Sequence, residues 1–199
     1  AFNLLQASGK DDKGAILFTM HDVVHDLATV LLKRYSISRR ATRCVDCSRV
    51  EFNSDSFSRK KCIRVLELKD SSVQKLPDSI CQLRHLGYLM ISEFTGLTTL
   101  PESLGHLKSL FHIDLSGCCG VRNLPDSVGK LINLAHIDLS GCSGLVNLPD
   151  SFGKLTSLKH IDLSDCSELE KLPQSFGKLT NLVHINLSRC SGIIRIAAC

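Results

Sequence analysis

The sequence predicts an α/β fold. We expect a solenoid in which short parallel strands stack on one side of a coil and short helical turns lie on the other, preceded by a small strand–helix unit. Two observations predict it. All five prolines of the 199-residue chain lie in the same phrase, Leu-Pro-x-Ser, and successive prolines are 24 residues apart. Within each period, apolar and polar residues alternate over a short stretch, as in a strand with one buried face. A constant period of about 20–50 residues is typical of solenoids.

The first expected elements are a strand and a helix within residues 15–33, and we assign residues 1–35 to this unit. Ala15 to Met20 predicts a strand. Asp22 is a suitable helix N-cap, and taken alone His21 and Asp22 are capping residues at a strand–helix corner. The helix is indicated by apolar residues at helical spacing. These are Val23, Val24, Leu27, Val30 and Leu31.

Residues 36–62 are expected to form a basic linker. Residues 1–62 hold 11 Lys and Arg against 7 Asp and Glu, whereas residues 63–199 hold 13 of each. A nucleic-acid or acidic-lipid patch is the alternative, but no aromatic or binding motif accompanies the charge, and we expect no nucleic-acid partner. Cys44 and Cys47 have no second pair of ligands at a spacing suited to zinc. No apolar run approaches the roughly 18 residues that a membrane span needs.

Residues 63–199 contain five full repeats and a partial sixth with the apolar frame Leu-x-x-Leu-x-Leu. This frame matches the leucine-rich repeat pattern L-x-x-L-x-L-x-x-N/C-x-L. Each repeat should supply one strand, stacked in parallel about 4.8 Å from the next. No repeat can bury its apolar face alone, so stability is roughly a sum over neighbours. The frame residues are Ile63, Leu66, Leu68, Leu86, Leu89, Ile91, Leu110, Ile113, Leu115, Leu134, Ile137, Leu139, Leu158, Ile161, Leu163, Leu182, Ile185 and Leu187.

After each strand the Leu-Pro phrase should turn the chain, because proline fixes its own φ and lacks an N–H donor. We expect Asp150 or Ser151, and the equivalent residues elsewhere, to cap a short helical turn that continues to Leu155. The core on that side should be closed by the residue after each Asp-Ser or its equivalent. These residues are Leu104, Val128, Phe152 and Phe176.

Four of the ten cysteines recur at the same repeat position and should form a buried ladder of reduced thiols that satisfy backbone groups after each strand. Their stacking distance falls within disulfide reach, so geometry alone does not exclude bridges. They are Cys118, Cys142, Cys166 and Cys190.

Three columns of side chains should face outward from the strands, and the first two are expected to form a concave surface that binds a protein partner. Like residues stack four deep in the first column. The predicted contact residues are Tyr88, His112, His136, His160 and His184 in the first column, and Met90, Asp114, Asp138, Asp162 and Asn186 in the second.

Two other readings of these columns stay open. A metal or catalytic His/Asp cluster is chemically conceivable, but an open face has no pocket that excludes water. A pH-tuned surface is the other, since a neighbouring Asp138 should favour the protonated form of His136. We expect no catalytic residue, no metal and no enzymatic activity.

Two motifs carry a family resemblance. Met20-His21-Asp22, continuing as Val-Val-His-Asp-Leu-Ala, resembles the MHD motif of plant disease-resistance proteins, the intracellular nucleotide-binding (NB-ARC) leucine-rich-repeat receptors. The longer wording is typical of the coiled-coil class. The repeat phrase "LPDSxGKLxxL" with its cysteines resembles the same family. Together the motifs cover residues 15–33 and 63–199.

This resemblance implies a function for each part. Residues 1–35 would be the end of a winged-helix subdomain of the nucleotide switch, with His21 contacting the β-phosphate of ADP and Asp22 holding the local geometry. The repeats would be the recognition and autoinhibition module in plant innate immunity. The partner would be a pathogen effector, a guarded host protein or the receptor's own switch domain, in the cytoplasm. The chain has no G-x-x-x-x-G-K-[ST] phosphate loop, so by itself it is expected to need no cofactor, while ADP or ATP is implied for the full-length receptor.

Three rivals remain. The first is a stand-alone intracellular leucine-rich-repeat scaffold in which the MHD match is incidental. The second is an extracellular repeat receptor, which would favour Asn over Cys in the ladder and has weak support from the sequon at Asn186. The third is an ATPase acting alone, which the missing phosphate loop disfavours.

Overall fold

The computed structural model describes residues 6–10, 16–19, 63–69, 74–92 and 94–193. The chain divides into two units, Ala1–Ala41 and Thr42–Cys199. In the first unit, β1 (Gln6–Lys10) pairs antiparallel with β2 (Ile16–Thr19). β2 falls within the strand predicted at Ala15–Met20.

Several sequence predictions lie outside the described residues. They are the helix over residues 22–33, the linker at residues 36–62, the cysteine pair Cys44 and Cys47, and the proposed nucleotide contacts His21 and Asp22. These remain predictions.

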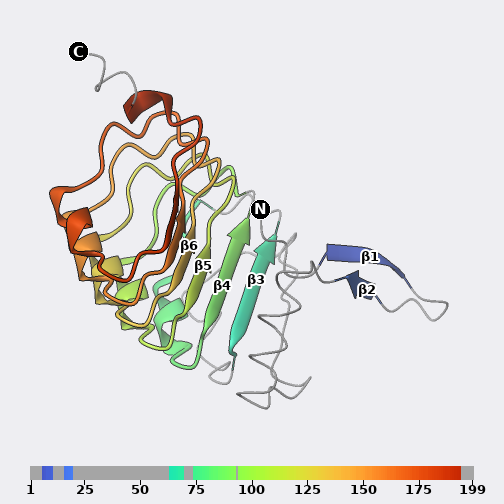
Figure 1. The fold of residues 1–199 in the computed structure, drawn as a ribbon. Coiled ribbons are helices and arrows are strands. Elements are labelled where there is room, and N and C mark those ends of the chain that lie inside the picture. Colours follow the sequence, from blue (N-terminus) through green and yellow to red (C-terminus); the bar gives the residue numbers. More distant parts are fainter. Residues whose placement is uncertain (1–5, 11–15, 20–62, 70–73, 93, 194–199) are drawn as a thin grey trace. The chain divides into compact units, whose positions relative to one another are not determined.

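The second unit contains a six-stranded sheet in which each strand pairs in parallel with the next strand in the sequence. Figure 1 shows the strands side by side, with short helical turns on the opposite side of the coil. The strands are β3 (Val65–Lys69), β4 (Tyr88–Ser92), β5 (His112–Asp114), β6 (His136–Asp138), β7 (His160–Asp162) and β8 (His184–Asn186). The predicted solenoid and its strands are confirmed.

The register follows the repeat without slippage. From β5 onward each residue pairs with the residue 24 positions later, as in His112 with His136 and Ile137 with Ile161. Ile113, Ile137 and Ile161 are buried inside the coil, since every second residue of a strand points to the same face. Their strand neighbours therefore occupy the opposite face, which we call the strand face.

The helical turns are single 3₁₀ turns, each directly after a proline of the repeat. Those prolines have φ between −64° and −72° and an extended ψ, so the chain turns where the sequence predicts. The turns are η1 (Asp78–Gln82), η2 (Glu102–His106), η3 (Asp126–Lys130), η4 (Asp150–Lys154) and η5 (Gln174–Lys178).

The predicted side-chain caps are wrong. The N-cap of η4 is Pro149, and no side chain caps this turn. The Phe152 N–H, a donor that a side-chain cap could have bound, donates instead to the Pro149 carbonyl at 2.9 Å. A 3₁₀ turn closes after three residues, so neither Asp150 nor Ser151 is needed as an acceptor.

The core fills the coil between the strands and the 3₁₀ turns. Leu104, Val128 and Phe152 are almost completely buried, as predicted, and Phe176 packs against them from the last described turn. The Phe152 and Phe176 rings stack nearly parallel, with centroids 6.2 Å apart. Burying a side chain of this size stabilises the fold by about 1.5–3 kcal/mol, and only the neighbouring repeat provides the burial.

Candidate functional site: the polar strand face

The predicted first column is a continuous stack of rings along the strand face. Tyr88 and His112 have ring centroids 5.9 Å apart, and His112 and His136 are also 5.9 Å apart. The stack tightens toward the end of the array, with centroids at 4.5 Å between His136 and His160 and 4.7 Å between His160 and His184. The parallel register of the strands brings like residues together at each step, and the rings are near parallel from His136 to His184, whereas His112 and His136 are tilted by 37°.

Exposure rises along this stack, which corrects the expectation that all ten predicted contact residues face solvent. His136, His160 and Asp162 are half-buried, and His184 and Asn186 are exposed. The accessible part of the face therefore lies on β7 and β8. The buried residues are Tyr88, Met90, His112, Asp114 and Asp138.

Phe111, a residue that the sequence reasoning did not single out, lies against the early part of this stack. Its ring lies 6.0 Å from Tyr88 and 5.2 Å from His136, so it covers the stack from the side. The equivalent position in the later repeats holds Ala135, Lys159 and Val183. Aromatic cover is thus confined to the early rungs, and the position just before each strand was the signal that could have shown it.

His112 and His136 are held in the neutral form, opposite to the direction expected for a pH-tuned surface. Burial lowers the pKa of His112 to about 4, against a smaller opposing effect of Asp138. Burial, aided by repulsion from His112, His160 and Lys159, lowers the pKa of His136 to about 4. Loss of hydration outweighs attraction to a carboxylate here, because a charged ring between two other imidazoles loses water without gaining a paired anion.

The aspartate column forms the turn that follows each strand. The Asp114 carboxylate accepts the Ser116 N–H at 2.8 Å, and the Asp138 carboxylate accepts the Ser140 N–H at 2.9 Å. This is an Asx turn, in which a carboxylate replaces a backbone acceptor two residues back. The spacing Asp-x-Ser, which recurs at the ends of β5, β6 and β7, was the signal that sequence reasoning missed.

The last rungs repeat this arrangement and add a link between strands. Asp162 accepts both the backbone N–H and the hydroxyl of Ser164, at 2.8 and 2.6 Å. Asn186 accepts the Ser188 N–H at 3.1 Å and donates from Nδ2 to the second Asp162 oxygen at 3.0 Å. An amide therefore serves the turn as a carboxylate does, and it removes the repulsion that a further aspartate beside Asp162 would create.

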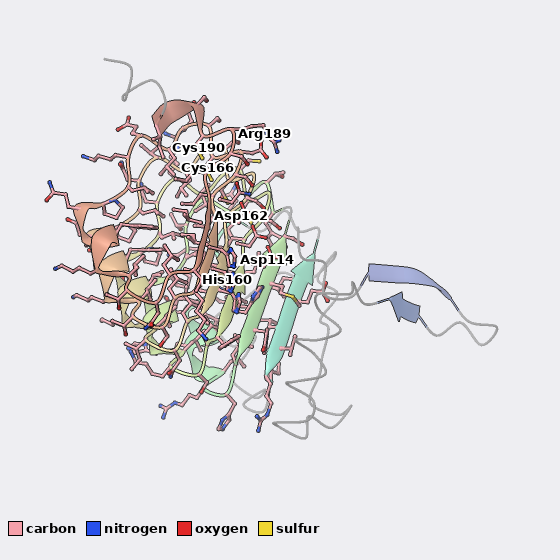
Figure 2. The ribbon with its side chains drawn as sticks, in the orientation of Figure 1. Asp114, His160, Asp162, Cys166, Arg189 and Cys190 are labelled. Carbon is pink, nitrogen blue, oxygen red and sulfur yellow. The ribbon has the colours of Figure 1, made fainter. Side chains whose placement is uncertain are left out.

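The cysteine ladder is structural, as predicted. Each thiol donates to a backbone carbonyl of the preceding repeat, as Cys142 does to Leu115 at 3.1 Å and Cys166 does to Leu139 at 3.2 Å. Burial raises the pKa of Cys118 and Cys166 to about 12, and these cysteines are free thiols. Figure 2 shows Cys166 and Cys190 just past the strand end that carries Asp162. A protonated, buried thiol is a poor nucleophile.

The described residues contain no group of three or more His, Cys, Asp and Glu side chains placed to hold a metal ion. Stacked imidazoles explain part of this, because parallel rings point their nitrogens in the same direction instead of toward one point. Within the described part of the chain, no helix is both long enough and apolar enough to cross a bilayer.

Comparison with known proteins identifies the repeat. A family model described as a leucine-rich repeat region matches residues 42–190, well over half of the chain. No curated protein matches this sequence.

Solved structures with this architecture include the leucine-rich repeat domain of APL1B, at 19% identity and a TM-score of 0.51, over 73% of this chain and 42% of that domain. This chain thus spans less than half of the APL1B domain. The leucine-rich repeat domain of the type III effector XCV3220 (XopL) is 21% identical over 73% of this chain and 67% of that one, with a TM-score of 0.43. A Leptospira interrogans leucine-rich repeat protein, LIC12759, is 20% identical over 65% of this chain and 50% of that one, with a TM-score of 0.31. At 19% identity, the likeness to the APL1B domain shows the fold alone.

Proposed function

Because the chain belongs to the leucine-rich repeat family, we propose that it is a non-enzymatic module that binds a protein partner through the exposed end of the strand face. One observation carries the proposal. The outward side chains stand in register on a stacked sheet, and their exposure rises from buried His112 to exposed His184. The contact residues are then His160, Asp162, His184 and Asn186.

This end of the face offers both polar and apolar groups. Val183, directly before His184 in the chain and at the position that Phe111 holds in an earlier repeat, is 66% exposed. An exposed ion pair lies just beyond the strands, where Arg189 donates to Asp165 at 2.6 Å. Protein interfaces combine an apolar centre with a polar rim and about one hydrogen bond per 100–200 Å², and this surface has the parts for one.

A site-specific photocrosslinker tests the proposal. Benzoylphenylalanine is placed at His184 in one variant and at Lys154, an exposed residue of η4, in a matched control. We expect a discrete crosslinked protein with the first variant alone. Titration of that purified protein should then show binding that is weakened about tenfold or more by the double variant His160→Glu, His184→Glu and unchanged by Lys154→Glu. Equal crosslinking from both positions, or equal binding by both variants, would refute the assignment.

The finer proposal is that the module belongs to an intracellular plant disease-resistance receptor, acting in the cytoplasm in recognition and autoinhibition. Its support is the order of motifs in the sequence, with Met20-His21-Asp22 ahead of a repeat array whose wording resembles that family. In an intact receptor His21 would contact the β-phosphate of ADP, and loss of that contact would release the inactive state. A group that touches the nucleotide in one conformation only biases a two-state equilibrium.

The stand-alone scaffold remains the second candidate, and the full-length transcript separates the two. A phosphate-binding loop encoded upstream of residue 1, in the same reading frame, would support the receptor. A transcript that encodes the repeats without a nucleotide-binding domain would leave the scaffold.

A further inference from the structure

Residues 63–199 are neutral in total, but one part of each repeat contains basic residues and no acidic residue. The segments that run from the second residue of each 3₁₀ turn to the residue before the next strand contain six Lys and Arg and no acidic residue, whereas the first residue of the turn is Asp or Glu in four of the five turns. We call these the basic loops. All 13 Asp and Glu of residues 63–199 lie elsewhere in the repeats. The basic loops are residues 79–87, 103–111, 127–135, 151–159 and 175–183.

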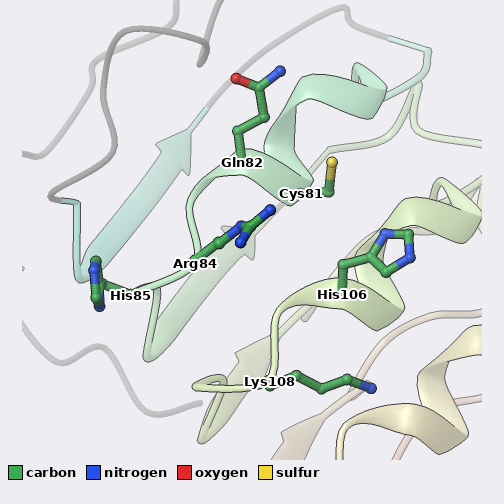
Figure 3. Close-up of a pocket in the computed structure, with 6 residues that line it drawn as sticks. All are labelled: Cys81, Gln82, Arg84, His85, His106 and Lys108. Carbon is green, nitrogen blue, oxygen red and sulfur yellow. The ribbon is translucent and has the colours of Figure 1, made fainter.

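The first two basic loops border a cleft of about 920 Å³. Figure 3 shows its side chains on η1, on η2 and on the loops that follow them. No acidic side chain is among the described residues that line it. The lining residues are Cys81, Gln82, Arg84, His85, His106 and Lys108.

The cationic groups of the cleft have unused donors. Arg84 and Lys108 are both exposed, and no described carboxylate forms an ion pair with either of them. Lys108 donates one hydrogen bond to the Lys130 carbonyl at 2.8 Å, which fixes its ammonium beside the third basic loop. An ammonium has three N–H donors and a guanidinium has five, so most of them still face the cleft or solvent.

An apolar side chain follows these cations at the same position of the next repeat. Arg84, Lys108 and Ile132 are 24 residues apart, and Ile132 is 55% exposed. Consecutive repeats are about 4.8 Å apart at the sheet, while side chains on the same face of an extended peptide are about 6.6 Å apart. The two spacings differ by about 1.8 Å per step, and the long side chains of Arg84 and Lys108 can take up that difference, so an extended segment laid across the loops can place alternate side chains near three successive repeats.

We propose that this cleft binds an extended acidic segment of a partner protein with the pattern acidic-x-acidic-x-apolar. The two carboxylates meet Arg84 and Lys108, with the imidazoles of His85 and His106 beside them, and the apolar residue packs on Ile132. The apolar contact favours a peptide over a bare phosphate ion, which has nothing to place there. This site is separate from the strand face, so it extends the proposed function without resting on it.

The test uses fluorescence anisotropy with a labelled peptide of sequence Gly-Glu-Ser-Glu-Ser-Leu-Gly and its counterpart with Gln in place of both Glu. We expect the acidic peptide to bind, with affinity falling as salt rises, and the amide peptide to bind about fivefold or more weakly. The double variant Arg84→Gln, Lys108→Gln should lose the preference for the acidic peptide. Ile132→Ser should weaken both peptides alike.

Matched controls separate this cleft from a generally basic edge. The double variant Lys154→Gln, Lys178→Gln removes two equivalent charges from later loops, and it should leave binding unchanged. An equal loss in that variant, equal affinity for the amide peptide, or full competition by inorganic phosphate or phosphatidylserine vesicles would overturn the proposal. His184→Glu should have no effect, so failure here is distinguishable from failure of the strand-face proposal. Far-UV circular dichroism of each variant confirms that it is folded.

Discussion

Replacing Gly105 by alanine is the sharpest test of how closely the repeats pack. Gly105 lies in η2, and a Cβ built there would be 2.6 Å from the Ser127 carbonyl oxygen and 2.7 Å from the Ser127 Cβ. Unstrained carbon contacts are about 3.5–4.0 Å, so the next repeat must move by about 1 Å. The backbone at Gly105 is not in the left-handed region, and close approach alone requires the glycine.

Gly177 supplies the matched control. It occupies the same place in the phrase Ser-Phe-Gly-Lys of η5, but a Cβ added there meets nothing within 4 Å. Both substitutions reduce the entropy of the unfolded chain by the same amount, about 0.4–1 kcal/mol of stabilisation. That gain cancels in the comparison. The difference between the variants is then the overpacking cost itself, about 1–3 kcal/mol.

Thermal unfolding followed by circular dichroism measures this difference. For a chain of this size 1 kcal/mol shifts Tm by about 2–4 °C, so Gly105→Ala should melt about 2–12 °C below Gly177→Ala. Adding Ser127→Gly to Gly105→Ala removes one of the two clashing groups and should recover part of the loss. Equal melting temperatures for the two alanine variants would refute the close packing of successive turns on which the stacking argument depends.

Three further predictions concern a histidine of the ring stack, the cysteine ladder and an aspartate of the strand face. The pKa of His112 in the folded protein, about 4, lies below its value of about 6.5 in the unfolded chain, so the unfolded state binds more protons between these values. The free energy of unfolding in urea titrations should therefore be highest above pH 6.5 and fall toward pH 4, by up to about 1.4 kcal/mol per pH unit from this residue. His112→Gln should reduce this dependence on pH. Native protein treated with a thiol reagent should react at exposed Cys119 and leave Cys142 unmodified until denaturant is added; modification of Cys142 at the same rate would contradict the buried ladder. Asp138→Asn should keep the acceptor for the Ser140 N–H and retain stability, whereas Asp138→Ala should lose about 1–2 kcal/mol in denaturant titration, and equal midpoints would argue against the Asx turn.

The fold of the repeat array could be predicted from the sequence because it depends on local periodicities. The alternation in His136-Ile137-Asp138 decides which side chain enters the coil, and a constant step of 24 residues leaves one register for the strands. The thiol ladder, the turn at each proline and the burial of Phe152 follow from the same frame. Each of these features depends on the contacts that a residue makes with the next repeat. Because the repeats are nearly identical in sequence, the residues of one repeat also show what the neighbouring repeat presents.

The chemistry of the strand face depended on tertiary structure, for two physical reasons. His112 is buried between its ring neighbours Tyr88 and His136, both of which contact Phe111, a residue outside the repeating frame, and a desolvated imidazole loses its charge even near Asp138. His184 is exposed, and among the described rings it stacks on His160 alone, so little of its surface is covered. The sequence by itself thus determined which residues stack, while the side chains packed around each rung decided which of them meet water.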